Sequence, residues 1–433
     1  MSHWVDHVVW WHVYPLGFVG AEKNLADARP EPHRLRRLIG WLDHLVSLGC
    51  NGLALGPIFT SSTHGYDTVD YFRIDPRLGD DQDFDALVTA CRERGIRLLL
   101  DGVFNHIGRE HPRFQQALRD GIGSDAASWF QLYDNGSAGI SADYFEGHDQ
   151  LIELDHDATE VQDLVRDVLL HWLGRGIDGW RLDAAYAVDP TFWAAILPAV
   201  RERHPDAWFV GEMIHGDYVD YVARSTIDSV TAYELWKATW SSLREGNLPE
   251  LEWTIGRHAD LIESFVPLTF LSNHDVTRVA SQIADPRHVQ HAIALLGFLP
   301  GVPSVYYGDE FGIEAVKEDR PGGDDAVRPE LPAERGLYQA GHPEIERLYR
   351  QLIGLRRRHA WLVDARVATS DVTSEQMLIT ARARHQTQPA LILALNLSDE
   401  SVPLTPVGQV IEAGSAVQHG RLAAHSWAVV EQG

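Results

Sequence analysis

The chain is poor in cysteine and in basic residues, and it has no long hydrophobic run. Cys50 and Cys91 are its only cysteines among 433 residues, which predicts two buried free thiols rather than a disulfide scaffold. No apolar stretch predicts a membrane span, and the first 20 residues lack the basic start and apolar core of a signal peptide. These absences together predict a cytoplasmic protein.

Acidic residues outnumber basic ones by 62 to 37, for a net charge of −25. Such a balance argues against nucleic acid and against an anionic membrane surface as partners, and it favours a neutral or cationic ligand. The acidity could equally serve solubility alone. The sequence also shows neither an internal repeat nor a low-complexity tract, so a repeat architecture is not predicted.

Apolar, strand-like runs alternate with amphipathic helical stretches along most of the chain. One such helix carries Leu35, Leu38 and Leu45 on one face, and another carries Phe84 and Cys91. Eight strand and helix units predict an α/β protein with a closed (β/α)8 barrel, the TIM barrel. The expected strands cover residues 8–14, 52–57, 96–101, 180–183, 208–212, 229–234, 268–272 and 304–307.

Two segments depart from this alternation. The stretch 107–158 separates the third strand from its helix and is far longer than an ordinary loop, which predicts a functional subdomain. From residue 363 onward short alternating runs replace the helical period, which predicts an antiparallel β-sandwich domain over 363–433. The barrel is then expected over 1–106 and 159–362, with the last domain serving as a packing cap.

Acidic residues stand at the ends of separate predicted strands, far apart in the sequence. They are Asp101, Asp183, Glu212, Asp275 and Glu310. One unpaired charge at a buried strand tip is costly, and the strands of a parallel barrel all end on one face, where active sites of such barrels lie. Four or five of these acids are therefore expected to form one cluster.

The short motifs around these acids resemble glycoside hydrolase family 13, the α-amylase superfamily. They are Asp101–His106, Gly179–Asp183, Gly211–Glu212 and Phe270–Asp275, which follow strands three, four, five and seven in the order that this family shows. Gly65–Tyr71 and Tyr306–Glu310 also look like segments of the family. The resemblance therefore covers nearly the whole chain and thins out beyond residue 336.

The resemblance implies a role for each matched residue. Asp183 would be the nucleophile, Glu212 the general acid and base, and Asp275 a third carboxylate that stabilises the transition state. Six further residues are implied to contact sugar. Tyr66 would stack on a sugar ring, and His106, Arg181 and His274 would hold the same ring. Asp324 and Arg328 would bind the next sugar outward. A surface salt bridge is an equal interpretation of the last pair. Asp101, Asn105 and Asn273 would support the site.

The chemistry of a retaining glycosidase explains these residue types. Such an enzyme needs an ionised carboxylate about 5 to 5.5 Å from a protonated one. Arg181 lies two residues before Asp183 on the same strand face and would keep it ionised, whereas Glu212 must hold a proton. Alternatively, Asp101 with Arg181 is a purely structural ion pair, or His106, His274, Asp101 and Asp275 hold zinc or manganese.

No metal and no other cofactor is predicted. Calcium-dependent α-amylases have a basic residue and a histidine after the nucleophile, where this chain has Tyr186 and Ala187. Although Asn105 is kept, a required calcium ion is therefore not expected at that site.

Other segments resemble the neopullulanase and cyclomaltodextrinase group, notably Leu151–Asp155 and Tyr66–Asp75. That group often has Trp where this chain has Ile214, and it usually begins with an extra β domain used in dimerisation, which is not expected here. Small or cyclic malto-oligosaccharides, including cyclic maltosyl-maltose, are the implied substrates. A transglycosylase, a sugar isomerase and a non-catalytic binding subunit remain alternatives, and a homodimer is left open.

Overall fold

The core of the protein is a barrel of eight parallel strands. The structure is a computed structural model that describes residues 4–29, 33–320, 322–339, 341–384, 388–415 and 417–432. The barrel strands are β1 (Trp10–Val13), β2 (Gly52–Leu55), β5 (Arg97–Gly102), β10 (Gly179–Leu182), β11 (Trp208–Gly211), β12 (Ser229–Val230), β13 (Leu268–Phe270) and β14 (Val302–Tyr306). They follow the order β12-β11-β10-β5-β2-β1-β14-β13, and a parallel bridge from Thr231 to Leu268 joins the two ends. The predicted fold class is confirmed.

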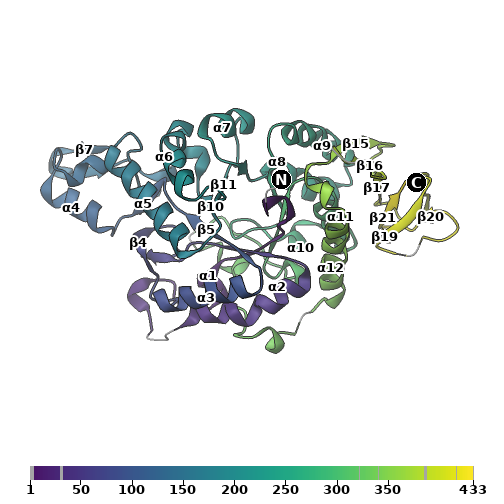
Figure 1. Ribbon diagram of the computed structural model, residues 1–433, viewed down its shortest axis with the longest axis horizontal. Coiled ribbons are helices and arrows are strands. Elements are labelled where there is room, and N and C mark those ends of the chain that lie inside the picture. The colour runs from purple at the N-terminus through teal and green to yellow at the C-terminus, as the bar shows by residue number, and fades with distance from the viewer. Residues whose placement is uncertain are drawn as a thin grey trace.

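Helices surround the barrel, as Figure 1 shows. They are α1 (Pro15–Phe18), α2 (Leu42–Leu48), α3 (Asp81–Glu93), α5 (Thr159–Arg175), α6 (Pro190–Arg203), α7 (Tyr218–Ser225), α8 (Tyr233–Glu245), α9 (Leu248–Ile262), α10 (Val279–Gln282), α11 (Val289–Phe298) and α12 (Pro343–Arg358). In α3 the stripe that includes Phe84 and Cys91 is buried, and Asp80 and Asp83 form a reciprocal capping box at its start. None of the described helices is long and apolar enough to cross a membrane.

Two expected elements differ from the structure. The strand expected over 229–234 ends at Val230, Thr231 adds only an isolated bridge to Leu268, and Tyr233 already begins α8. The helix expected around Leu35 begins as the 3₁₀ helix η3 (Arg34–Trp41) and continues as α2. Neither change moves a strand out of the barrel.

The chain between β5 and α5 forms a lobe beside the barrel, where Figure 1 labels α4 and β7, and the limits 107–158 of a subdomain stay a prediction. It contains α4 (Pro112–Asp120), a hairpin of β7 (Leu132–Asp134) with β8 (Ile140–Ala142), and β9 (Leu151–Glu153). Strand β9 pairs antiparallel with β6 (His106–Gly108). A second hairpin, β3 (Phe59–Ser61) with β4 (Thr68–Ile74), follows β2. The lobe therefore leaves and rejoins the barrel through neighbouring strands.

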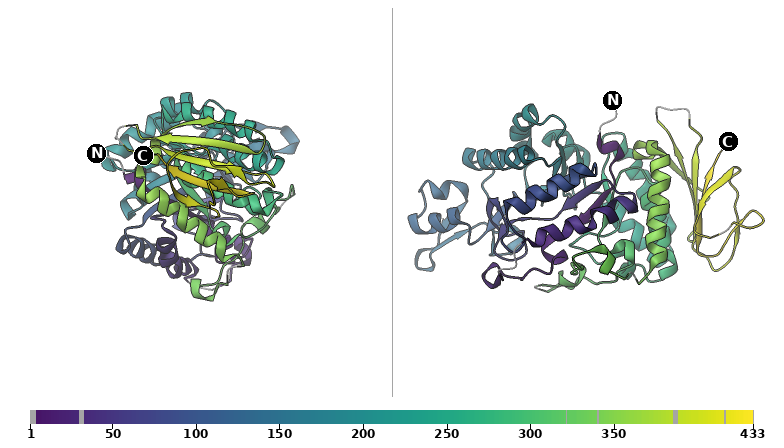
Figure 2. Two further views of the ribbon diagram at one scale, coloured as in Figure 1. Left: turned by 90° about the vertical axis from the view of Figure 1, so that its right-hand side faces the viewer. Right: turned by 60° about the horizontal axis from the view of Figure 1, so that its bottom comes forward.

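The C-terminal part is a five-stranded antiparallel sheet. Its order is β15 (Arg366–Ser370), β16 (Gln376–Arg382), β17 (Leu391–Asn396), β21 (Ser426–Glu431) and β19 (Gln409–Ala413), beside a small pair of β18 (Val402–Pro403) with β20 (Arg421–Leu422). Figure 2 shows α12 between the barrel and this sheet. The expected antiparallel C-terminal sheet is confirmed, whereas the exact domain limits stay predictions.

Aromatic side chains fill much of the core. Inward-facing residues of six barrel strands form a cluster of their own, in which Trp10 and Trp208 stack with ring centroids 5.9 Å apart. Cys50 and Cys91 are both buried and free, as predicted. Fully buried tryptophans also include Trp11, Trp41, Trp172, Trp180, Trp193 and Trp427.

Candidate active site

Three acids from three adjacent strands meet on the guanidinium of Arg181. Its Nη1 atom lies 2.7 Å from Asp101 Oδ2 and 2.9 Å from Asp183 Oδ1, and its Nη2 atom lies 2.7 Å from Glu212 Oε1. Asp101 lies in β5, Arg181 in β10, and Asp183 and Glu212 directly follow β10 and β11. The cluster predicted from the strand ends therefore exists, and one positive charge faces three carboxylates.

Burial raises the pKa of the Asp183 carboxyl well above its usual range. Arg181 opposes that shift, but the negative charges of Glu212, Asp101 and Asp275 add to it. Burial likewise raises the pKa of Asp101. The sequence predicted that Arg181 keeps Asp183 ionised, whereas in the structure three carboxylates compete for this guanidinium.

The raised pKa of Asp183 predicts an acid limb in the pH profile of catalysis. A nucleophilic carboxylate must be ionised, so activity is lost as the pH falls through this pKa, above the range of an ordinary aspartate. Replacing Asp101 by Asn removes one repelling charge and should move the acid limb of kcat/KM to lower pH. An unmoved limb in the residual activity of Asp101→Asn would contradict this electrostatic account.

Glu212 has further partners that fix its carboxylate. The Tyr233 hydroxyl donates to Glu212 Oε1 at 3.1 Å, and the Ala184 N–H donates to Oε2 at 3.1 Å. Asn273 donates from Nδ2 to the Tyr233 oxygen at 2.8 Å, so it reaches Glu212 through Tyr233. Ala184 has a φ of +45°, a strained conformation for a residue with a side chain, which is typical of functional sites.

Sequence reasoning missed Tyr233. It lay near the end of the expected sixth strand, and the only available signal was its polar-tipped aromatic side chain at that position. It is the first residue of α8, and its side chain is buried at the bottom of the cluster. Its hydroxyl ties the fifth and seventh strand ends together.

Removal of the Tyr233 hydroxyl should weaken catalysis measurably. In Tyr233→Phe, Glu212 loses one donor and the Asn273 amide loses its acceptor, at a cost of about 1.5 kcal/mol or roughly tenfold in kcat/KM. Tyr221→Phe is the matched control, because that buried hydroxyl donates to the Ala185 and Val188 carbonyls and not to an acid. Equal activity losses in the two variants would argue against a specific role of Tyr233.

Asp275 follows the seventh strand and has partners of its own. His274 Nε2 lies 2.8 Å from Asp275 Oδ2, and Arg328 Nη2 donates to Oδ1 at 2.7 Å. Burial would raise the pKa of Asp275, but His274 and Arg328 outweigh it and hold this pKa well below its usual range. Asp275 is therefore ionised while Asp183 is driven toward its protonated form.

Arg328 and Asp324 are joined, as their spacing suggested. Arg328 Nη2 lies 3.2 Å from Asp324 Oδ2, and Lys317 Nζ lies 3.3 Å from Asp324 Oδ1. Arg328 also donates to the His274 carbonyl at 2.9 Å, and its side chain is only 9% exposed. An isolated surface salt bridge is thus excluded for Arg328, which braces Asp275, while its contact with sugar stays a prediction.

Tyr66 lies among the polar residues of the cluster. Its hydroxyl donates to Asp101 Oδ2 at 3.1 Å and is hydrogen-bonded to His274 Nε2, and its ring lies parallel to that of His274 at a centroid distance of 5.2 Å. Tyr14, which follows β1, is parallel to His274 at 5.8 Å and lies under the Arg328 guanidinium at 4.5 Å. Sequence reasoning missed Tyr14.

His106 connects the barrel to the lobe. Its Nε2 atom is 3.1 Å from the Tyr66 carbonyl oxygen, its Nδ1 is 3.3 Å from the Asn105 amide nitrogen, and its ring stacks on Phe145 at 4.6 Å. Burial lowers the pKa of His106 to about 3, so the imidazole is neutral and Nε2 donates to the carbonyl. The structure thus brings every residue of the predicted site into one connected network.

Glu310 is the one strand-end acid that does not join the cluster. Its carboxylate is fully buried and accepts from Trp11 Nε1 at 3.0 Å and from the Gly308 N–H at 2.7 Å, with His44 Nε2 at 3.1 Å. Trp11 lies in β1 and His44 in α2, so Glu310 fastens a helix to the barrel. Four acids, rather than five, form the cluster.

Below the acids the barrel encloses a cavity of about 40 Å³, lined among others by His12, Arg181, Glu212, Tyr233 and His274.

The alternative of a metal held by His106, His274, Asp101 and Asp275 receives no support. Within the described ranges, the side-chain groups close enough to share a metal ion lie elsewhere, at Asp285, His288 and His425 and at His33, Asp80 and Asp83.

Fold and site together define a (β/α)8 barrel with a carboxylate cluster at the C-terminal ends of its strands. The family model described as "Alpha amylase, catalytic domain" matches residues 34–334. The chain therefore belongs to the α-amylase family.

Similar proteins have been described in several bacteria. The intracellular maltogenic amylase of Bacillus subtilis is 31% identical over 354 residues, and the cyclomaltodextrinase of Geobacillus thermopakistaniensis is 32% identical over 335 residues. These matches cover 73% and 72% of this chain, and the chain spans 57% of the length of either relative. The structure of a cyclic α-maltosyl-(1→6)-maltose hydrolase from Arthrobacter globiformis in complex with maltose is 25% identical, with a TM-score of 0.82 over 100% of both chains.

Proposed function

We propose that this protein is a retaining glycosidase that cleaves α-glucosidic bonds in small or cyclic malto-oligosaccharides. The observation that carries the proposal is the pair of carboxylates, Asp183 and Glu212, held by the two terminal nitrogens of Arg181, with ionised Asp275 opposite. A retaining mechanism needs two neighbouring carboxyl groups with different protonation, and one shared guanidinium keeps the pair together.

The reaction follows from these positions. At a pH above the raised pKa of Asp183, its ionised carboxylate attacks the anomeric carbon while Glu212 gives its proton to the departing glycosidic oxygen, so the C–O bond breaks and a glycosyl ester forms on Asp183. Glu212 then takes a proton from water, whose oxygen attacks the same carbon and releases Asp183. Negative Asp275 stabilises the positive charge that develops on the sugar ring in both steps.

The substrate class rests on the relatives. Two of them are named for action on cyclomaltodextrin and for maltose formation, and a structure of the same extent was solved with maltose. Cleavage of α-1,4 bonds, α-1,6 bonds or both belongs to the proposal. A transglycosylase or a sugar isomerase is the alternative, because both use the same carboxylates and differ in what intercepts the intermediate.

Product analysis tests this proposal directly. The protein is incubated with maltotriose, panose, a cyclodextrin and cyclic maltosyl-maltose, with and without added glucose as acceptor. Chromatography identifies the products, and proton NMR of the first product shows its anomer. We expect shorter sugars with the α configuration retained. Longer or isomerised products would favour the alternative, and an initial β product would refute the retaining mechanism.

We further propose that the protein acts inside the cell on imported oligosaccharides, which the intracellular relative supports. A homodimer is also part of the proposal. Light scattering on the purified protein measures its mass against the 48.5 kDa of one chain.

A further inference from the structure

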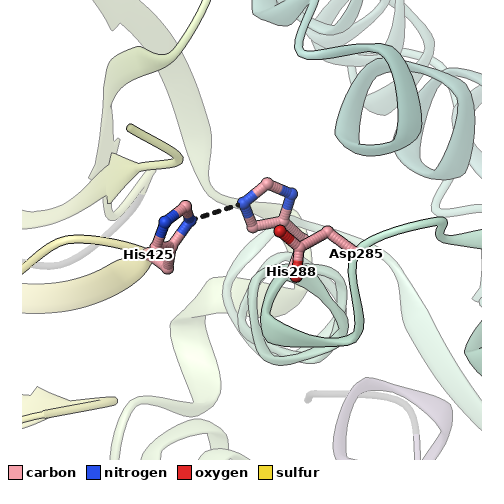
Figure 3. A group of neighbouring side chains, drawn as sticks. All are labelled: Asp285, His288 and His425. Atoms are coloured by element: carbon pink, nitrogen blue, oxygen red, sulfur yellow. Dashed lines mark hydrogen bonds between the residues drawn. The ribbon is translucent and has the colours of Figure 1, made fainter. Parts of the chain in front are cut away.

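A cluster of metal-binding side chains lies where the barrel meets the C-terminal sheet, away from the acids of the active site. Asp285 precedes the short helix η8 (Pro286–His288), which ends on His288, and His425 directly precedes β21. One donor atom of each residue lies within 4.8 Å of the other two. Figure 3 shows that the two imidazoles point toward each other from opposite sides of the junction.

The facing nitrogens are His288 Nε2 and His425 Nδ1, 3.0 Å apart. The outer nitrogen of His425, Nε2, lies 2.8 Å from Asp399 Oδ1, an acceptor that holds the imidazole hydrogen on that side. The Nδ1 atom of His425 therefore directs its lone pair at His288. A carboxylate behind a histidine in this way is typical of metal ligands, because it fixes the tautomer and makes the ligand more basic.

His288 lies between two acceptors. Its Nδ1 atom is 3.3 Å from the Leu243 carbonyl oxygen, and its Nε2 atom is 3.3 Å from the Leu397 carbonyl oxygen. A neutral imidazole has a hydrogen on only one nitrogen, so the lone pair of the other nitrogen must face a carbonyl oxygen. His288 is buried, with 8% of its surface exposed, where such a mismatch is costly. A cation bound at Nε2 would remove it.

We propose that this cluster binds a divalent transition metal of the zinc class. Two imidazole nitrogens form the main ligands, and the Leu397 carbonyl and one Asp285 oxygen complete a four-coordinate set. Two nitrogens bound tetrahedrally to zinc are about 3.4 Å apart, so the imidazoles need to separate by only a few tenths of an ångström. Both oxygens of Asp285 already accept from Arg287, from its Nε at 3.0 Å and from its Nη2 at 2.6 Å, so Asp285 is the weaker ligand.

Such an ion would join parts of the chain that are 137 residues apart, since Asp285 and His288 belong to the barrel and His425 to the sheet. The metal would therefore act on the attachment of the C-terminal sheet rather than on the glycosidase chemistry. Metal binding should raise the melting temperature of the protein, because the folded chain alone brings these ligands together.

The test is titration of the full chain with ZnCl₂ after treatment with a chelator, followed by calorimetry. Wild type should bind one more zinc ion than His425→Ala. His419→Ala is the matched control. Both histidines lie in the C-terminal part with a positive φ, 51° for His419 and 47° for His425. His419, however, is exposed and lies outside the cluster. It should bind zinc as wild type does. Cobalt substitution should give visible absorption bands of a tetrahedral site in wild type and not in His425→Ala.

A second variant guards against a folding defect in the first. Asp399 is 85% exposed and is not itself a proposed ligand, so Asp399→Asn should fold normally and weaken zinc binding by about 10- to 100-fold. Equal zinc stoichiometry and affinity in wild type and in His425→Ala would overturn the proposal. The two imidazoles would then share a proton in place of a metal ion.

Discussion

Replacing Asp183 by Asn is expected to reduce cleavage of maltotriose by at least about 10⁴-fold, or roughly 5.4 kcal/mol of activation free energy. Asparagine has nearly the same shape and can still contact Arg181, but its amide cannot form the glycosyl ester on which the retaining route depends. The measurement is kcat/KM, with the melting temperature recorded to show that the variant folds.

The control for this loss is Asp189→Asn, six residues further along the chain. Asp189 caps α6 by accepting from the Thr191 N–H at 2.8 Å, and asparagine caps helices as well as aspartate does. Its activity should match that of wild type. If Asp183→Asn kept more than a tenth of the wild-type rate, Asp183 would not be the nucleophile.

Replacing Glu212 by Gln is expected to slow cleavage of maltotriose by about 10²- to 10⁴-fold, because the leaving oxygen then departs without a proton. The loss should shrink with α-maltosyl fluoride, since fluoride leaves without protonation. Azide should restore part of the turnover, because it attacks the intermediate without needing a base. Rates for both substrates, with and without azide, separate the two roles of Glu212.

The control here is Glu202→Gln, an exposed glutamate in α6, whose rates should remain unchanged. An equal loss on maltotriose and on the fluoride would contradict proton donation by Glu212. It would indicate that the carboxylate acts only through its ion pair with Arg181. Asp183→Asn should behave differently, with no gain from the fluoride or from azide.

The barrel was predictable because apolar runs alternate with amphipathic helical stretches, and five of these runs end on acid, amide or histidine residues. Asp183 and Glu212 directly follow their strands, so the rule that parallel strands end on one face placed them correctly. The same rule failed for Glu310, which also follows a strand. Whether a strand-end side chain turns into the barrel mouth or toward α2 depends on partners such as Trp11 and His44, and spacing does not show them.

Other features of the site depend on contacts that no local pattern encodes. Tyr233 reaches Glu212 only because the sixth strand is two residues long and α8 begins at once. The raised pKa of Asp183 results from burial and from carboxylates on neighbouring strands; the sequence predicted this acidic cluster but not that it would outweigh Arg181. The pairing of His288 with His425 spans 137 residues and needs the sheet to be docked.

The pairing of β6 with β9 has a consequence for how this protein can diversify. Because the lobe starts and ends on one antiparallel ladder, that ladder fixes the distance between its two ends. Doubling the length of such a closed excursion adds only about 0.6 kcal/mol of chain entropy. Phe145 within it stacks on His106. The lobe is thus open to change: insertions or swaps that keep this ladder and the packed face can reshape one wall of the proposed sugar site while the carboxylate cluster keeps its place.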